Sequence, residues 1–187
     1  LGFFANIGSK FYGNTILSLY GRVDDHKTTN INETYKINIT KLINKFKFGL
    51  THSTGLRNPT LYELYGHNGR TDLYKHVANP NAKAEKSTTN EFFVKYDFSE
   101  KMSFETTAYN NSIQDALLYD SNFGGGTGYT NSNADLKQEG LETTFSFKDT
   151  DQKLTLFNTI SSSKQIDGTH QLNRPNLTYG VKYLKKL

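Results

Sequence analysis

The segment TTNEFFVKYDF, residues 88–98, alternates between two kinds of side chain, with Phe93 as the exception on its charged face. Its even positions carry Phe92, Val94 and Tyr96, whereas its odd positions carry Glu91 and Lys95. Only a period of two residues separates apolar from charged side chains in this way, so the segment is predicted to be a β-strand and not a helix. A dry interior would penalise each unpaired charge heavily, so the charged face is expected to contact water.

The same alternation returns along the whole chain. It is found, in places more weakly, at residues 2–9, 17–24, 35–40, 46–51, 102–113, 141–148, 154–161 and 177–183. Together with residues 88–98, these segments predict about nine strands. Most are close to the roughly 9–11 residues that a tilted strand needs to cross a membrane.

The connections between these segments are alternately short and long. Tight polar turns are expected at residues 10–14, 43–45, 98–101 and 149–152, and long irregular connections at residues 25–32, 54–85, 115–135 and 162–176. This arrangement puts all the long loops at one end of the sheet, as in outer-membrane barrels with short periplasmic turns and long extracellular loops. An ordinary sheet with one solvated face would explain the alternation but not this asymmetry.

The predicted fold is therefore all-β: an antiparallel transmembrane β-barrel segment. Tyr96, Phe98, Phe147, Tyr179 and Tyr183 lie near strand ends, where an interfacial aromatic girdle is expected. Bacterial single-chain barrels contain an even number of strands, so about nine strands indicate a piece of a larger wall. Residues 1–187 are thus predicted to be one partial barrel domain.

Composition excludes several other classes of protein. The chain has 187 residues and no cysteine, which removes disulfides, zinc–thiolate sites and cysteine nucleophiles. No run of 18 apolar residues is present, so transmembrane helices are excluded. The net charge of +4 is scattered, without a basic stripe, and nucleic-acid binding is not expected.

Three local sequences suggest a family. They are TGLRNPTLYELYG at residues 54–66, NPNAKAEKS at residues 79–87 and QEGLE at residues 138–142. In this order they resemble the barrel domain of TonB-dependent outer-membrane receptors, which carries G-F-R-A-P-x-L-x-E-L-Y, then N-P-N-L-x-P-E-K-S, then an x-x-G-x-E strand start. The resemblance runs from about residue 17 to residue 183. Departures from the pattern are Leu56, Asn58, Ala82 and Ala84, where the family has Phe, Ala, Leu and Pro.

Within this family, Tyr119-Asp120 and the strand at residues 177–184 look most like the cobalamin receptor branch, although heme and catecholate-siderophore receptors share these features. The positions that match the family motifs are Arg57, Pro59, Leu61, Glu63, Leu64, Tyr65, Asn79, Pro80, Glu85, Lys86, Ser87, Gly140 and Glu142. We expect them to be scaffold. Arg57, Glu63 and Glu85 in particular are expected to hold loop or rim geometry and not to touch a ligand.

The loop at residues 118–134 is the expected ligand-binding element. Its candidate residues are Tyr119, Asp120, Asn122, Phe123, Tyr129 and Asn131. Aromatic rings beside amide groups give flat apolar contact and a few directional hydrogen bonds, which is the usual composition of a small-molecule site. The glycines at residues 124–126 would let the backbone approach a bulky ligand. The alternative is a mobile glycine-rich surface loop.

The resemblance implies a receptor in the Gram-negative outer membrane. Such a receptor binds cobalamin or a ferric siderophore on its extracellular loops, and TonB drives uptake through a plug inside a roughly 22-strand barrel. Expected partners are the TonB complex, outer-membrane lipid or lipopolysaccharide, and the nutrient. The plug domain and the final strands are expected to lie outside this chain.

Two other classes of function remain open from the residues. The first is a passive porin-type channel without energy coupling. The second is a barrel with lipase or protease activity, but no G-x-S-x-G or H-E-x-x-H pattern is present, so an enzyme is not expected. No cofactor and no metal site are expected either.

Overall fold

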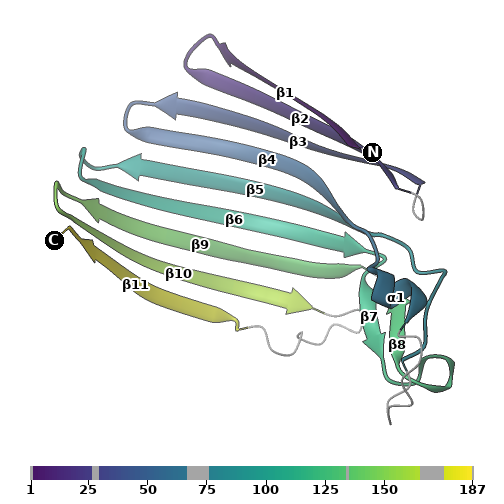
Figure 1. Ribbon diagram of the computed structural model, residues 1–187. Helices are drawn as coiled ribbons and strands as arrows, with labels where there is room; N and C mark the ends of the chain where they lie inside the picture. The colour runs from purple at the N-terminus through teal and green to yellow at the C-terminus, as the bar shows by residue number, and fades with distance from the viewer. Residues whose placement is uncertain (1, 27–29, 67–75, 134, 165–174, 187) are drawn as a thin grey trace.

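The computed structural model describes residues 2–26, 30–66, 76–133, 135–164 and 175–186 (Figure 1). These residues form a nine-stranded antiparallel sheet in the order β1-β2-β3-β4-β5-β6-β9-β10-β11. Its strands are β1 (Gly2–Phe11), β2 (Thr15–His26), β3 (Asn30–Ile43), β4 (Phe46–Arg57), β5 (Glu85–Asp97), β6 (Met102–Gln114), β9 (Leu136–Lys148), β10 (Gln152–Lys164) and β11 (Leu177–Lys185). The prediction of about nine antiparallel strands is confirmed.

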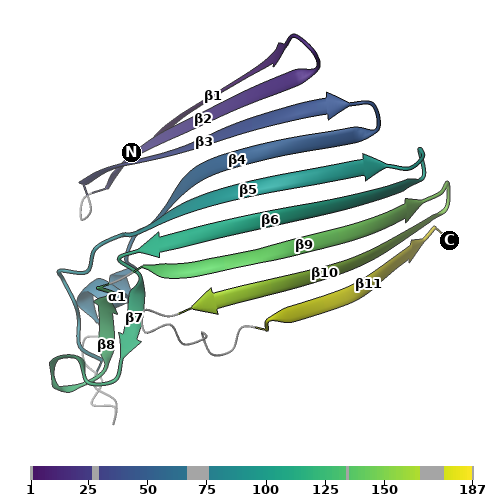
Figure 2. The same cartoon turned by 180° about the vertical axis from the view of Figure 1, so that it is seen from behind.

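The four predicted tight turns all lie at one end of the sheet, and the long connections β4–β5, β6–β9 and β10–β11 lie at the other, as predicted (Figures 1 and 2). The long connection predicted at residues 25–32 is wrong, because β2 and β3 stay paired as far as His26 and Asn30, and only residues 27–29, which lie outside the described part, join them. Two of the tight turns require positive φ angles, which are 67° at Gly13, 57° at Asn14 and 52° at Asn44. Glycine and asparagine tolerate this left-handed region better than other residues do. Within the described residues, no helix is long and apolar enough to cross a membrane.

The long connections differ from the prediction in extent and in structure. β2 continues to His26, β3 begins at Asn30 and β4 continues to Arg57, so these strands are longer than their alternation indicated. The connections are also not irregular throughout. One contains the helix α1 (Leu61–Tyr65), and another contains the hairpin β7 (Leu117–Asp120) and β8 (Gly128–Asn131) with a 3-10 turn, η1 (Phe123–Gly125). Of the remaining connection, residues 165–174 lie outside the described part.

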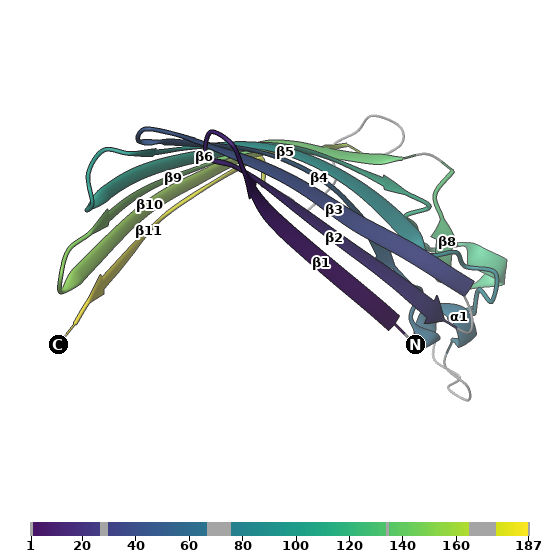
Figure 3. The same ribbon diagram turned by 90° about the horizontal axis from the view of Figure 1, so that it is seen from above.

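The register sorts the side chains into two faces, because directly opposed residues lie on the same face. One row runs across eight strands on the apolar face: Leu17, Ile39, Leu50, Phe92, Ala108, Leu141, Ile160 and Leu177. On the polar face the neighbouring row reads Thr40, Gly49, Phe93, Thr107, Glu142, Thr159 and Thr178. Leu50 is 56% exposed and Phe92 46% exposed, so none of the described residues forms a packed layer over the apolar face of this arched sheet (Figure 3).

Aromatic side chains gather on the apolar face near the turn end. The ring centroids of Phe46 and Tyr96 lie 4.5 Å apart, and those of Tyr96 and Phe98 lie 4.7 Å apart. Part of the predicted aromatic girdle therefore forms one contacting cluster where β4 and β5 approach their turns.

Aromatic rings also occur on the polar face, and three of them lie over a glycine of the adjacent strand. A Cβ atom on Gly49 would lie 2.0 Å from the ring of Phe93, its direct cross-strand partner. The same relation holds for two more directly opposed pairs, Tyr109 with Gly140 and Phe157 with Gly180. The glycines let the rings lie along the sheet instead of standing out from it.

Neighbouring threonines on β6 provide a matched test of the two faces. Thr106 lies on the apolar face, where its Oγ1 is 3.3 Å from Oγ1 of Thr143, and Thr107 lies on the polar face opposite Glu142. If the apolar face contacts lipid, Thr106→Lys should destabilise the folded barrel by about 2–4 kcal/mol. Thr107→Lys should change stability by less than about 0.5 kcal/mol, since it brings a cation opposite a carboxylate at a solvated position.

The measurement is urea unfolding of the full-length barrel in phospholipid vesicles. Equal destabilisation by the two lysines would contradict the assignment of the faces.

Candidate functional site

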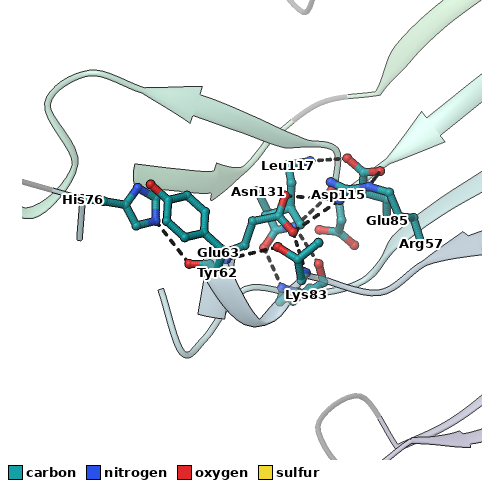
Figure 4. Close-up of polar contacts among 10 residues, drawn as sticks. Arg57, Tyr62, Glu63, His76, Lys83, Glu85, Asp115, Leu117 and Asn131 are labelled. Carbon is teal, nitrogen blue, oxygen red and sulfur yellow. Dashed lines mark hydrogen bonds and ion pairs between the residues drawn. The ribbon is translucent and has the colours of Figure 1, made fainter. Parts of the chain in front are cut away.

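The polar face ends, at the loop side of the sheet, in an ion pair between two directly opposed residues. Arg57, the last residue of β4, pairs in register with Glu85, the first residue of β5. Nε of Arg57 donates to Oε2 of Glu85 at 2.5 Å, and Nη1 of Arg57 lies 3.2 Å from Oε1 of Glu63 in α1. One guanidinium group therefore joins two strands to the helix that follows (Figure 4).

Helix α1 starts with reciprocal capping. Oγ1 of Thr60 accepts the N–H of Glu63 at 3.2 Å, and the Glu63 carboxylate accepts the N–H of Thr60 at 2.6 Å. This capping box satisfies two N–H groups at the helix start, and Gly66, with a φ of 67°, ends the helix. A helix of five residues has little stability of its own, so its position depends on these contacts and on the ion pair.

Glu85 also fastens the hairpin β7–β8. Its Oε1 accepts the N–H of Leu117 at 2.6 Å. A small apolar cluster lies beneath this contact, formed by Leu64, Ala82 and Leu117 with Tyr129 packed against it. Ala82 is one of the departures from the family pattern, and it is 8% exposed within this cluster.

Asn131 closes the base of the same hairpin. Its Nδ2 donates to the carbonyl oxygens of Asp115 at 2.6 Å and Lys83 at 3.0 Å, and its Oδ1 accepts the N–H of Lys83 at 2.7 Å. Asn79 adds a further link, because its Nδ2 donates to the carbonyl oxygen of Tyr129 at 2.9 Å. We call this set of contacts the loop anchor: Arg57, Glu63, Glu85, Asn79 and Asn131 with their partners.

Charge stabilises the loop anchor near neutral pH. Burial raises the pKa of Glu63, but hydrogen bonds from Thr60 and Arg57 outweigh it, and the pKa lies below its usual value of 4.5. Burial likewise raises the pKa of Glu85, but the hydrogen bonds from Arg57 and from the N–H of Leu117 outweigh burial. The pKa of Glu85 therefore also lies below its usual value. The hydrogen bond to Glu85 is in turn the main reason why the pKa of Arg57 is raised. All three groups are therefore charged near pH 7.

Four aromatic side chains form a continuous run over the loop anchor. The rings of Tyr62 and His76 stack at 4.0 Å, those of His76 and Tyr129 are 5.8 Å apart, and those of Tyr129 and Tyr119 meet edge to face at 5.9 Å. Nε2 of His76 lies 3.2 Å from the carbonyl oxygen of Tyr62. Tyr62 is 48% exposed and Tyr119 61% exposed. We call Tyr62, His76, Tyr119 and Tyr129 the aromatic run.

The six residues expected to bind a ligand fall into three groups. Tyr119 and Tyr129 belong to the aromatic run. Asp120 and Asn122 shape the tip of the hairpin, where Oδ1 of Asp120 accepts the N–H of Asn122 at 2.8 Å, and Phe123 packs against Gly128. Asn131 is engaged within the loop anchor. No local sequence pattern marked Tyr62 or His76 as members of a site, since only the fold brings them into one run with Tyr129.

The other residues of the family motifs surround this region or lie in the sheet. Pro59 and Leu64 are buried, whereas Leu61 and Tyr65 are 75% and 55% exposed on α1. Pro80 and Lys86 are exposed, and Ser87 is the cross-strand partner of Gly55. Gly140 and Glu142 lie within β9, opposite Tyr109 and Thr107 of β6.

Comparison with protein families identifies the fold. Residues 1–186 match the family model described as TonB dependent receptor-like, beta-barrel. The chain belongs to this family. The barrels of the family cross the outer membrane, which agrees with the two faces of the sheet and with its short turns and longer loops. No curated protein sequence matches the chain.

Solved structures of the same fold include siderophore receptors and a copper transporter. The siderophore receptor PirA from Acinetobacter baumannii superposes with a TM-score of 0.79 at 17% identity, covering 97% of this chain and 30% of the receptor. PirA from Pseudomonas aeruginosa gives a TM-score of 0.74 at 18% identity, covering 87% and 31%. The copper transporter OprC gives a TM-score of 0.71 at 18% identity, covering 98% and 32%. The chain thus spans about a third of the length of these structures.

Removing Arg57 should release the hairpin from the sheet. In Arg57→Ala the carboxylate of Glu63, whose side chain is only 8% exposed, loses its charged partner. We expect local opening to become easier by about 1–3 kcal/mol, so that protection of the Leu117 amide falls by about fivefold to 150-fold in hydrogen exchange of the full-length receptor.

Arg22→Ala is the matched control. It removes a pair with Asp24 in which Arg22 is 63% exposed, and such surface pairs contribute little. Unchanged protection of Leu117 in Arg57→Ala, or equal loss in both variants, would refute the role of the loop anchor.

Acid should loosen the same hairpin. Because Glu63 and Glu85 have lowered pKa values in the folded state, their stabilisation is complete above the usual value of 4.5 and is lost as pH falls through the lower folded values. We expect the protection factor of the Leu117 amide to be constant from pH 7 to 5 and to decline below about pH 4.5. In Glu85→Gln this decline should be smaller. A protection factor independent of pH down to 3 would contradict it.

Proposed function

We propose that this chain is part of the barrel wall of an outer-membrane receptor that takes up a scarce, large nutrient by TonB-dependent transport. The nutrient class is an iron chelate or cobalamin, bound on the extracellular loops. The observation that carries the proposal is the aromatic run at the loop end of a barrel wall whose family is that of TonB-dependent receptors.

The chemistry of the aromatic run fits a flat or macrocyclic ligand. Partly exposed rings provide large apolar contact area at small entropic cost, and the phenol and imidazole groups add directional hydrogen bonds. The loop anchor holds these rings on a fixed base, which reduces the ordering cost of binding. Three solved structures of this fold are named as siderophore receptors or a copper transporter, which favours a metal chelate as the ligand.

The complete receptor would supply what this chain does not contain. The proposal places a plug domain inside a closed barrel of which this sheet is one part, and the TonB complex acts through that plug. Lipid or lipopolysaccharide of the outer membrane surrounds the apolar face. The chain itself contributes wall and part of the ligand surface, and the proposed function involves no chemical transformation of the nutrient.

A passive channel is the alternative function. The mixed charges on the polar face, such as Lys95 opposite Glu105, are compatible with a water-filled lumen. Family membership and the anchored aromatic surface favour the receptor, since a diffusion channel has no need of a rigid aromatic surface above its mouth.

Substitution of Tyr119 tests the ligand surface in the full-length receptor. Tyr119→Ala should weaken binding of a ferric catecholate chelate about tenfold, because an exposed ring contact is lost while the hairpin keeps its anchor. Tyr65→Ala is the matched control, since Tyr65 is 55% exposed but lies outside the aromatic run. Binding is measured by fluorescence titration, and cobalamin is titrated in parallel to separate the two nutrient classes.

Uptake of the radiolabelled ligand by cells with and without TonB separates receptor from channel. Saturable uptake that requires TonB is expected. Uptake that rises linearly with concentration and is independent of TonB would show a porin and end the receptor proposal.

A further inference from the structure

The apolar face of the sheet contains a hollow that the nutrient site does not use. It has a volume of about 530 Å³ and lies across β3, β4, β5 and β6. Its apolar lining consists of Ile37, Ile39, Leu50, Phe92 and Ala108. Such a volume is within the range of about 300–1,000 Å³ that is usual for small-molecule sites.

The hollow has a simple origin in the register. In the apolar row that crosses the sheet, Ala108 of β6 stands between Phe92 of β5 and Leu141 of β9. A methyl group fills much less space than the isobutyl or benzyl groups of these two neighbours. The surface formed by this row is therefore depressed at Ala108.

A polar edge borders the hollow on the loop side. Tyr35 Oη lies 3.1 Å from Nε2 of His52, and Nδ1 of His52 lies 2.7 Å from Oδ1 of Asn90. An amide oxygen can only accept, so Nδ1–H of His52 donates to Oδ1 of Asn90, and the ring is held between Asn90 and the Tyr35 hydroxyl. Asn110, directly opposite Asn90, also lines the hollow.

This polar edge marks the outer boundary of the apolar belt. His52 and Asn90 are two residues farther toward the loops than Leu50 and Phe92 on the same face of β4 and β5. In an outer-membrane barrel the loop end faces the cell exterior. From outside to inside, the surface thus presents a hydrogen-bonding edge and then an apolar depression, the order in which a lipid of the outer leaflet presents its acyl linkage and its chain.

We propose that this hollow binds an acyl chain of lipopolysaccharide, with the amide or ester linkage of the chain at Tyr35, His52, Asn90 and Asn110. Lipopolysaccharide is the lipid of the leaflet that the loop end contacts, and its lipid A portion carries several acyl chains with hydroxyl, amide and ester groups near the head. The site is on the face of the sheet opposite to the polar one, so it is separate from the proposed nutrient path.

The test uses the full-length receptor purified from the outer membrane in mild detergent. Ala108→Leu fills the hollow with an apolar side chain. Thr106→Leu is the control, because Thr106 lies two residues away on the same strand and face but does not line the hollow. Native mass spectrometry measures how many lipid A molecules stay bound per receptor, and titration with lipid A and with phosphatidylethanolamine gives the affinity for each.

The expected result is about tenfold weaker lipid A binding in Ala108→Leu, from the loss of a few buried methylene contacts, with Thr106→Leu unchanged. His52→Phe, which keeps an aromatic ring but loses both hydrogen bonds, should also weaken lipid A binding. Nutrient binding should be unaffected in all three variants, so a failure here leaves the proposed function standing.

Three outcomes would overturn the proposal. The first is equal lipid A affinity in Ala108→Leu and the native receptor. The second is equal affinity of the native receptor for lipid A and phosphatidylethanolamine, which would indicate an unspecific belt. The third is a receptor dimer that Ala108→Leu dissociates, which would make the hollow a contact between two copies.

Discussion

The antiparallel register of the sheet is the constraint on which the other features depend. In a membrane, backbone N–H and C=O groups have no water to pair with, so neighbouring strands must satisfy each other completely. Because side chains alternate with a period of two, a shift of one residue between strands would move every apolar side chain to the wet face. The unbroken row from Leu17 to Leu177 shows that one register is kept across eight of the nine described strands.

The same register determines where the loops are attached. It brings Arg57 opposite Glu85 at the last rung of the β4–β5 ladder, and from that rung the contacts extend to Glu63 in α1 and to Leu117 in β7. The buried apolar cluster of Leu64, Ala82 and Leu117 is small. Ion pairs and hydrogen bonds therefore provide much of the stabilisation of this loop region that a hydrophobic core provides in a soluble domain. The sheet is thus connected through these contacts to α1 and β7, which hold the residues of the aromatic run in place.

How far the sequence predicted this structure depends on the range over which each signal acts. The alternation at residues 88–98 predicted a strand, and β5 covers residues 88–97 of it, because period two is a local property of a two-faced strand. The ends of β2, β3 and β4 were missed because beyond the membrane neither face must be apolar, and Thr54 and Gly55 show little contrast. Helix α1 was missed although Thr60 and Glu63 form a capping box, since five residues are too few to show a helical period. The contact of Tyr62 with His76 and Tyr129 is tertiary, and no local pattern encodes it.

The glycines beneath the polar-face aromatics have a consequence for the clearance inside the barrel. Phe93, Tyr109 and Phe157 each lie flat because the opposing residue has no side chain. Were Gly49 replaced by valine, the ring of Phe93 would have to swing away from the wall and toward the barrel axis. The strands would still pair, yet the free cross-section would narrow by the depth of a phenyl ring. The width of the passage thus depends on three glycines, Gly49, Gly140 and Gly180, which have no side chain of their own.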